Sequence, residues 1–216
     1  MTDQTDKTIV SFLLDETGSM DSVRDKTVSG FNEYVATLRR NETPTLLRLM
    51  TFNTDGFNVV YDFDDIHSVA DLTRESYRPR ALTNLYDAIA KLVQDTEDYV
   101  KRMSPAPRVM CTIMTDGEEN SSTEYTRAAI FKLITDKEKE GWGFAYLGAN
   151  QDAWAASESI GIHRRNAANY EAEAPDVALR STAEATSRWV RRRRQAGKVE
   201  RFFVEEDLVK IKGPGP

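Results

Sequence analysis

Short uninterrupted hydrophobic runs alternate along the chain with longer segments in which hydrophobic residues recur every three or four positions. The runs at residues 9–14 and 109–115 are typical of strands buried on both faces of a sheet. The runs at residues 46–52 and 142–147 indicate two further strands. This alternation predicts an α/β protein, with a sheet placed between two layers of helices.

A hairpin is predicted where Asn53-Thr54-Asp55-Gly56 separates the strand at residues 46–52 from another hydrophobic run at residues 57–63. Asn, Asp and Gly adopt the backbone angles of tight turns. We therefore expect these two strands to be antiparallel. A last edge strand is predicted around residues 163–169.

Hydrophobic residues at helical spacing predict four long helices and a short one. The long helices are expected at residues 21–40, 85–100 with Thr83 as the cap, 123–140 and 175–195, and the short one at residues 152–161. A further short helix is expected in the loop that carries Arg78 and Arg80. In the helix at 123–140, the residues expected to face the core are Ala128, Phe131 and Ile134. The hydrophobic residues Phe202 and Phe203 are expected to dock onto the body of the protein or onto a partner.

Composition and charge narrow the class of protein. With 216 residues, the chain has the length of one ordinary domain. Its net charge of -6 argues against a general binder of nucleic acids or membranes, because an acidic surface repels phosphate groups. The single cysteine, Cys111, excludes internal disulfides. No hydrophobic run approaches the ~20 residues of a membrane span, and the polar N-terminus lacks a signal core, so a cytoplasmic location is expected.

Two acidic loops follow the two most hydrophobic strands. Asp15 ends the first strand and begins the pattern Asp15, Thr17, Ser19, while Asp116 directly follows the strand at residues 109–115. Ligands of such sheets bind at the carboxyl ends of the strands. Two carboxylates brought together there repel each other, so a bound cation or a basic side chain must compensate. No Lys or Arg lies in either loop. The segment with Arg78 and Arg80 is a basic candidate, and a cation is the better interpretation.

The ligand types indicate which cation. Carboxylate and hydroxyl oxygens suit Mg²⁺, Mn²⁺ or Ca²⁺. His67 and His163 are distant from both loops in the sequence, which disfavours zinc. Thr83 supplies a third hydroxyl if its helix begins at the same edge of the sheet, and is otherwise an ordinary helix cap.

These residues resemble a von Willebrand factor type A (VWA) domain with a metal-ion-dependent adhesion site (MIDAS). That family's pattern is Asp-x-Ser-x-Ser, a distant Thr and a distant Asp that is commonly followed by Gly. Asp15, Thr17 and Ser19 match the first element, Thr83 the second and Asp116 the third. The departure is Thr17 in place of Ser, and a threonine hydroxyl can serve equally well.

The resemblance implies a Rossmann-like VWA fold: a mostly parallel sheet of about six strands, one of them an antiparallel edge strand, with helices on both faces. It covers residues 8–196, leaving 1–7 as a flexible N-terminus and 197–216 as a C-terminal extension. It also implies that a metal, Mg²⁺ first, is completed by an Asp or Glu of a protein partner. The segment from Tyr146 to Trp154 looks like a bacterial and phage subgroup of this family.

Other functions were weighed against this one. An aspartyl phosphotransferase of the haloacid dehalogenase type needs a second Asp where this chain has Thr17. No Gly-x-Ser-x-Gly elbow and no Gly-x-x-x-x-Gly-Lys loop is present, so the sequence favours a protein that is not an enzyme. The runner-up is an assembly component of a phage or of an ATPase-linked complex, in which the metal only stabilises the loops.

A basic run near the end of the last helix invites a nucleic-acid interpretation. Its arginines are Arg188, Arg191, Arg192, Arg193 and Arg194. The preferred interpretation is a solvated helix end, where cations favourably meet the negative end of the helix dipole.

Overall fold

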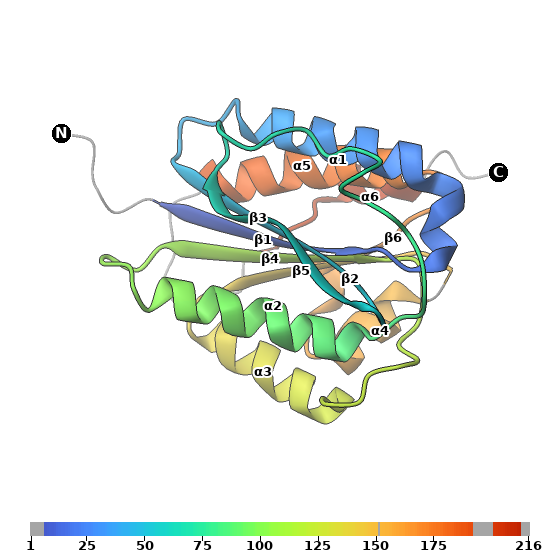
Figure 1. Ribbon diagram of the computed structural model, residues 1–216. Helices are drawn as coiled ribbons and strands as arrows, with labels where there is room; N and C mark the ends of the chain where they lie inside the picture. Colours follow the sequence, from blue (N-terminus) through green and yellow to red (C-terminus); the bar gives the residue numbers. More distant parts are fainter. Residues whose placement is uncertain (1–6, 151, 192–200, 213–216) are drawn as a thin grey trace.

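The computed structural model describes residues 7–150, 152–191 and 201–212. These residues form one six-stranded sheet in the order β3-β2-β1-β4-β5-β6 (Figure 1). The strands are β1 (Thr8–Asp15), β2 (Thr45–Asn53), β3 (Gly56–Asp65), β4 (Arg108–Thr115), β5 (Gly143–Gly148) and β6 (Ala167–Asn169). Every strand expected from the hydrophobic pattern is present.

The two most hydrophobic strands are neighbours at the centre of the sheet. β1 pairs in parallel with both β2 and β4, and every residue of β1 is buried. β5 and β6 continue the parallel sheet. β3 is the only antiparallel strand among the described residues and pairs with β2 through the predicted hairpin. The carboxyl ends of β1 and β4 therefore lie side by side.

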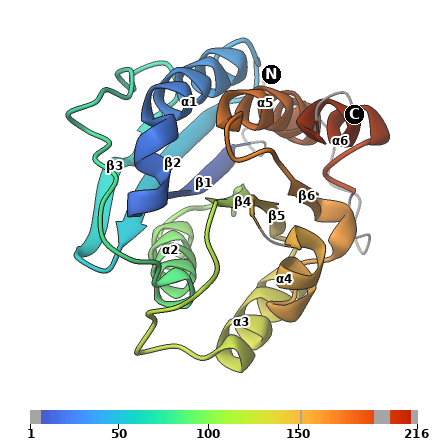
Figure 2. The same cartoon turned by 90° about the vertical axis from the view of Figure 1, so that its right-hand side faces the viewer.

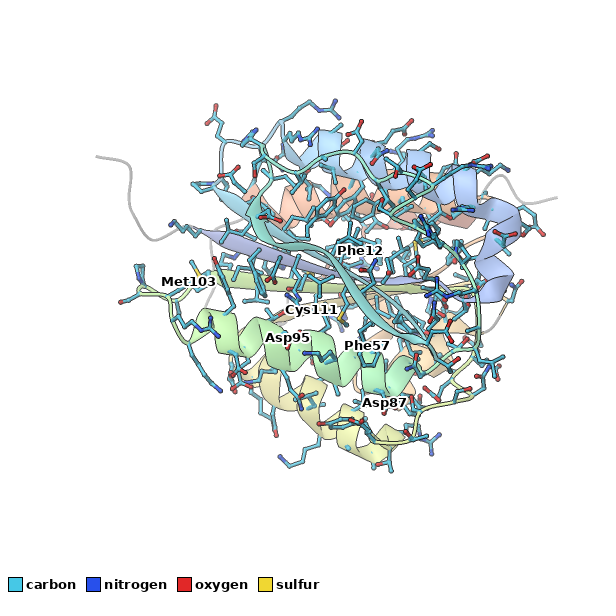
Figure 3. The ribbon with its side chains drawn as sticks, in the orientation of Figure 1. Phe12, Phe57, Asp87, Asp95, Met103 and Cys111 are labelled. Carbon is cyan, nitrogen blue, oxygen red and sulfur yellow. The ribbon has the colours of Figure 1, made fainter. Side chains whose placement is uncertain are left out.

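Helices cover both faces of the sheet, as Figure 2 shows. On one side lie α1 (Arg24–Leu38), α5 (Pro175–Arg191) and α6 (Glu205–Lys212), and on the other lie α2 (Leu85–Val100), α3 (Arg127–Lys139) and α4 (Ala153–Ser159). Each face buries its own hydrophobic cluster. Phe12 belongs to the cluster under α1 and α5, and Cys111 to the cluster under α2 (Figure 3). Alternate residues of the central strands supply the two clusters, because successive side chains of a strand point to opposite faces.

Several helix boundaries differ from the prediction. The first helical segment starts as the 3₁₀ helix η1 (Gly18–Val23) before α1, because Ser19 is held at the end of the sheet by a side-chain hydrogen bond to Asp116. The loop with Arg78 and Arg80 contains no helix among its described residues. Its backbone instead bonds to the end of β1: the Arg80 amide donates to the Glu16 carbonyl. Pairing with this strand end replaces the internal bonds that a helix would need.

Thr83 is not the cap of the second helix. α2 begins at Leu85 with Asn84 in the cap position, and no side-chain cap hydrogen bond forms there. The backbone amide of Thr83 instead donates to Oδ1 of Asn120 at 3.2 Å. The hydroxyl of Thr83 is therefore not needed to cap the helix.

The inward face of α3 was predicted correctly only in part. Ile134 faces the core as expected, together with Ile130. Ala128 and Phe131 are exposed instead, and Phe131 retains 46% of its accessible surface. The helix starts at Arg127, capped by the Thr126 side chain, because the preceding loop is bound to α2. That start fixes which side of the helix faces the sheet.

The C-terminal segment packs against the body of the protein. Phe202 and Phe203 are buried in the hydrophobic cluster under α1 and α5, as expected for docking onto the body. Arg188 of α5 forms an ion pair with Asp207, of which 1% is exposed. The predicted helix end at 195 and the arginines Arg192, Arg193 and Arg194 lie outside the described residues.

None of the helices in the described ranges combines the length and the apolar character that crossing a membrane requires.

Candidate metal centre

The candidate centre lies at the rim where β1 and β4 end. Asp15 is the last residue of β1, and Asp116 follows the last residue of β4. Oδ1 of Asp15 accepts a hydrogen bond from the Thr17 amide at 2.7 Å. Its Oδ2 accepts from the Thr115 hydroxyl at 2.6 Å. The Asp15 carboxylate is thus fixed in orientation by both flanking loops.

A chain of hydroxyl groups links the two carboxylates. The Thr17 hydroxyl lies 3.2 Å from the Ser19 hydroxyl. The Ser19 hydroxyl donates to Oδ1 of Asp116 at 2.7 Å. The structure therefore brings together Asp15, Thr17, Ser19 and Asp116, which are separated by up to 101 positions in sequence (116 − 15).

Thr83 reaches the same rim from the start of α2. A Cβ atom built on Gly117 would lie 3.2 Å from the Thr83 hydroxyl oxygen, so this hydroxyl lies directly against the residue after Asp116. Glycine is required here for close approach rather than for an unusual backbone angle. All five residues predicted from the sequence thus occupy one rim of the sheet.

Glu16 holds the neighbouring loop in place and was missed by the sequence analysis. Its carboxylate accepts hydrogen bonds from the Thr51 hydroxyl at 2.6 Å and from the Arg78 amide. The amide of Gly18 also donates to the carbonyl of Ala81, a residue with a φ of 62°. These bonds tie the loop at residues 78–81 to the loop at residues 15–19. The signal available in the sequence was the position of Glu16 between the predicted ligands Asp15 and Thr17.

The loop after Asp116 is fixed by Asp87, which sequence reasoning missed, and by Glu119. The Asp87 carboxylate accepts from the backbone amides of Thr123 and Tyr125, each at 2.8 Å. The Glu119 carboxylate accepts from the amides of Ser121 and Ser122 and, at 2.9 Å, from the Tyr86 amide. Such bonds hold a loop rigidly, because hydrogen bonds to an ionised carboxylate are stronger than neutral ones.

Burial sets the electrostatics of the carboxylate pair. The pKa of Asp15 is raised to about 6, chiefly by burial and to a smaller extent by the charge of Asp116. The hydrogen bonds from Thr115 and Thr17 act in the opposite direction. Burial also raises the pKa of Asp116, although the bond from Ser19 lowers it. Both shifts show that this rim disfavours two negative charges in the absence of a cation.

The candidate basic segment with Arg78 and Arg80 does not compensate these charges. The guanidinium group of Arg80 pairs with Asp55 at 2.7 Å. Arg78 contacts this rim through its backbone amide, which donates to the Glu16 carboxylate. The cation interpretation made from the sequence is therefore favoured over a basic partner.

The donor set fits a hard divalent cation. Two carboxylates and three hydroxyls converge, and oxygen ligands of this kind suit Mg²⁺. Within residues 7–150, 152–191 and 201–212, no three His, Cys, Asp or Glu side chains are grouped so as to hold a metal. A cation at this rim would thus depend on the hydroxyls of Thr17, Ser19 and Thr83.

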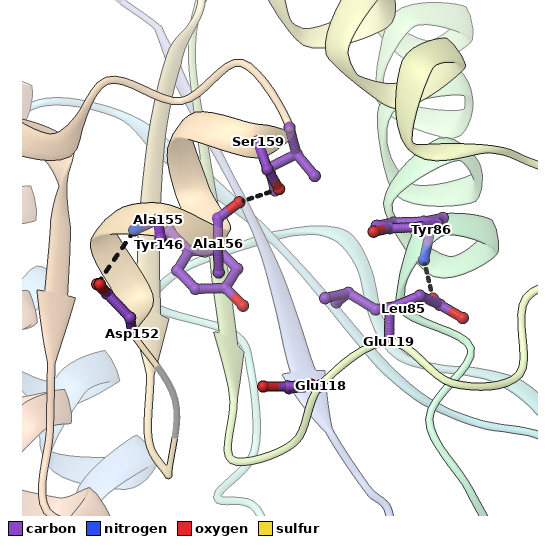
Figure 4. Close-up of a pocket in the computed structure, with 10 residues that line it drawn as sticks. Leu85, Tyr86, Glu118, Glu119, Tyr146, Asp152, Ala155, Ala156 and Ser159 are labelled. Atoms are coloured by element: carbon purple, nitrogen blue, oxygen red, sulfur yellow. Dashed lines mark hydrogen bonds between the residues drawn. The ribbon is translucent and has the colours of Figure 1, made fainter.

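A groove of about 330 Å³ lies beside this rim, between α2 and α4 (Figure 4). Tyr86 and Tyr146 line it together with the acidic residues Glu118, Glu119 and Asp152. Asp152 caps α4 by accepting from the amides of Trp154 and Ala155. Asn150 does not cap: its side-chain amide donates to the Asp116 carbonyl at 3.3 Å and so supports the loop.

Comparison with known proteins identifies the fold. No protein-family model and no curated protein sequence matches the chain. Solved structures do match. Proximal thread matrix protein 1 from the mussel byssus, with a zinc-occupied MIDAS motif, matches over 83% of this chain, with a TM-score of 0.63 and 12% identity. The pilus adhesin SpaC from Lactobacillus rhamnosus GG matches over 88%, with a TM-score of 0.65 and 11% identity.

A von Willebrand factor type A structure from Catenulispora acidiphila matches over 85% of the chain, with a TM-score of 0.57 and 14% identity. The chain spans less than half of each of these proteins, namely 46%, 31% and 42% of their lengths in the same order. At such identities the likeness shows the fold. The chain has the Rossmann-like VWA fold, with one antiparallel strand and otherwise parallel pairing.

Proposed function

We propose that this protein binds a divalent cation, Mg²⁺, through Asp15, Thr17, Ser19, Thr83 and Asp116, and that the cation binds a carboxylate of a partner protein. The observation that carries the proposal is a pair of buried carboxylates linked through Thr17 and Ser19: the Thr17 amide donates to Asp15, the two hydroxyls lie 3.2 Å apart, and the Ser19 hydroxyl donates to Asp116. The zinc-occupied MIDAS motif of the mussel protein supports a divalent cation on this fold.

The ligand types explain how such a site would recognise a partner. Hydroxyl ligands carry no charge, so a cation held partly by hydroxyls keeps more of its positive charge than one held by carboxylates alone. When bound, the cation supplies a positively charged coordination position that an Asp or Glu side chain can complete. The hydrogen bonds of the surrounding loops orient the ligand side chains. The open coordination position would then lie at the end of the sheet. No bond is made or broken, which is consistent with a binding protein rather than an enzyme.

Calorimetric titration with Mg²⁺ tests the metal site. We expect the Asp15→Ala and Asp116→Ala variants to lose Mg²⁺ binding while their circular dichroism spectra stay native. The metal-free Asp116→Asn variant should be at least as stable as the wild-type protein, because it removes the repulsion between the two buried carboxylates.

The matched control is Asp98→Asn, an exposed carboxylate on α2 whose loss should leave Mg²⁺ affinity unchanged. Unchanged Mg²⁺ affinity in both alanine variants would refute the assignment of the site. Mn²⁺, Ca²⁺ and Zn²⁺ titrated in the same way identify which ion the ligands prefer.

A further inference from the structure

Tyr170 lies at the same rim as the candidate metal centre, two strands away from Asp116. Thr115 of β4 pairs with Gly148 of β5, and Gly148 pairs with Asn169 of β6. The ladder continues one residue further: the amide of Ala149 donates to the Thr115 carbonyl at 3.1 Å, and the amide of Tyr170 donates to the Gly148 carbonyl at 3.0 Å. Asp116, Ala149 and Tyr170 therefore form one row across the rim.

The side chains of this row point to the same face of the sheet. Ala149 and Tyr170 both belong to the hydrophobic cluster under α1 and α5, as does Met114, two residues before Asp116. Neighbouring strands are about 4.8 Å apart, so the backbones of Asp116 and Tyr170 are roughly 10 Å apart. The small Ala149 between them leaves room for the long tyrosine side chain to extend toward Asp116.

The hydroxyl of Tyr170 is buried without a hydrogen-bond partner among the residues that the structure describes. Only 4% of this residue is exposed. Burying a hydroxyl without a partner is costly, so such a group is a rare feature that needs an explanation. The charges of Asp116 and Asp15 act on this hydroxyl: after burial, they are the next causes that raise the pKa of Tyr170.

A second buried tyrosine at this rim shows the contrast. The hydroxyl of Tyr77 donates to the backbone carbonyl of Asp15 at 2.6 Å, so its hydrogen-bonding capacity is used within the fold. Tyr170 is also buried and also feels the charges of Asp15 and Asp116, but the described part of the chain offers its hydroxyl no such acceptor. A packing role alone would be served equally well by phenylalanine.

We propose that the hydroxyl of Tyr170 donates a hydrogen bond to an oxygen atom in the ligand sphere of the divalent cation that this rim binds, so that Tyr170 is a positioning residue of the metal centre. This inference rests on the proposed function. A donor of this kind fixes the orientation of the ligands, and the loss of one typically weakens metal binding by about 10–100-fold.

The Tyr170→Phe variant tests the role, because it removes the hydroxyl and keeps the ring. We expect its Mg²⁺ affinity, measured by calorimetry, to fall by about 10–100-fold. In urea unfolding, the metal-free variant should be as stable as the wild-type protein or more stable, since the removed hydroxyl has no partner to lose.

Tyr34→Phe is the matched control. Tyr34 is a buried tyrosine of the same cluster, and its hydroxyl lies 3.2 Å from the Thr186 hydroxyl on α5. Its removal should produce the opposite pattern: lower stability of the metal-free protein and unchanged Mg²⁺ affinity.

The outcomes separate this inference from the proposed function. If the wild-type protein binds Mg²⁺ and Asp116→Asn does not, unchanged affinity in Tyr170→Phe overturns the role of Tyr170 alone. A loss of metal-free stability in Tyr170→Phe as large as that in Tyr34→Phe would overturn it too, by showing a structural hydroxyl. A wild-type protein that binds no divalent cation overturns both proposals.

Discussion

At the scale of single residues, the rim brings two carboxylates close together and places a tyrosine hydroxyl near them. Asp15 and Asp116 are both buried carboxylates, and Thr17 and Ser19 bridge them. Burial raises the pKa of both acids, because it disfavours their charged forms. Keeping both carboxylates charged at this rim therefore lowers the stability of the fold. The hydroxyl of Tyr170, which has no partner among the described residues, adds to this cost. The proposed cation would offset these terms together.

Gly117 offers a test of the contact between Thr83 and the loop after Asp116. In Gly117→Ala, the new methyl group would lie 3.2 Å from the Thr83 hydroxyl oxygen and push it aside. Crowding of this kind costs about 1–3 kcal/mol. If about 1.4 kcal/mol of that cost falls on the metal-bound state, Mg²⁺ affinity drops roughly tenfold in calorimetry.

Gly18→Ala is the control for this substitution within the same rim. Its Cβ would lie 3.6 Å from the Ala81 carbonyl oxygen, which is ordinary contact, so affinity should be retained. Equal affinities in the two alanine variants would show that the Thr83 hydroxyl does not bind the metal.

At this scale, the sequence indicated the candidate ligand residues but not the residues that support them. Asp15, Thr17, Ser19, Thr83 and Asp116 form a pattern whose spacing is visible along the chain. Glu16, Asp87 and Asn120 form no such pattern, because their partners are backbone amides of distant loops. Thr83 was expected to serve as a helix cap or as a ligand, and only the observed start of α2 decides against the cap.

At the scale of elements, the loop between β4 and α3 is held by α2 rather than by its own turns. The Asp87 carboxylate, 8% exposed, accepts amides from three successive residues of this loop, Thr123, Glu124 and Tyr125. The same loop carries Asp116 at one end and Asn120, which bonds to Thr83, near its middle. Two of the three ligand segments are thus coupled through α2.

Removing the Asp87 carboxylate should therefore loosen the metal site from a distance. We expect Asp87→Ala to lower the free energy of unfolding by about 2–4 kcal/mol, because several buried amides lose a charged acceptor. Hydrogen exchange at the amides of Thr123 and Tyr125 should accelerate more than exchange in β1.

Asp98→Ala, on the same helix, removes an exposed carboxylate paired with Lys101 and should change stability by no more than about 1 kcal/mol. Similar exchange rates at the two loop amides in Asp87→Ala and the wild-type protein would contradict the coupling through α2.

The boundaries of elements were the weakest part of the sequence prediction, for a physical reason. Hydrophobic spacing indicated that a helix follows β4, but the expected face with Ala128 and Phe131 was wrong. That helix begins four residues later than expected because Asp87 holds residues 123–125 as a loop (127 − 123). Long-range hydrogen bonds of this kind leave no periodic signal in the sequence.

At the scale of the whole molecule, the candidate ligands Asp15 and Asp116 lie at the end of the sheet where β1 and β4 finish side by side. Arg188 near the end of α5 pairs with Asp207 of α6, so this member of the basic run takes part in the fold. The interpretation of the rest of the run as a solvated helix end stays a prediction. The bacterial or phage origin and the cytoplasmic location stay predictions.

Partner capture should depend on the metal if the proposed function is correct. A protein captured by the immobilised wild-type chain in Mg²⁺ should be released by a chelator and recaptured when Mg²⁺ is restored, whereas the Asp116→Asn chain should not capture it. Mg²⁺ at 100 times its dissociation constant should also stabilise the wild-type fold by about 2.7 kcal/mol.

Capture that survives the chelator, together with stabilisation by Mg²⁺, would favour the runner-up function. In that case the metal stabilises the loops of an assembly component, and the partner binds elsewhere. Free acetate or glutamate added as competitor distinguishes the two further, because only a partner bound through a carboxylate on the metal should be displaced.

The sequence by itself determined the strand cores, the α/β class and the candidate ligand residues, because burial on both faces and ligand chemistry both appear as local patterns. Tertiary structure decided whether the ligands meet: the parallel pairing of β1 and β4 brings Asp15 beside Thr115, and Ser19 reaches Asp116 across 97 positions of the chain. It also decided that Tyr170 lies in the row of Asp116, through the register of three strands. Register depends on how distant strands pack together, and no local pattern of residues encodes it.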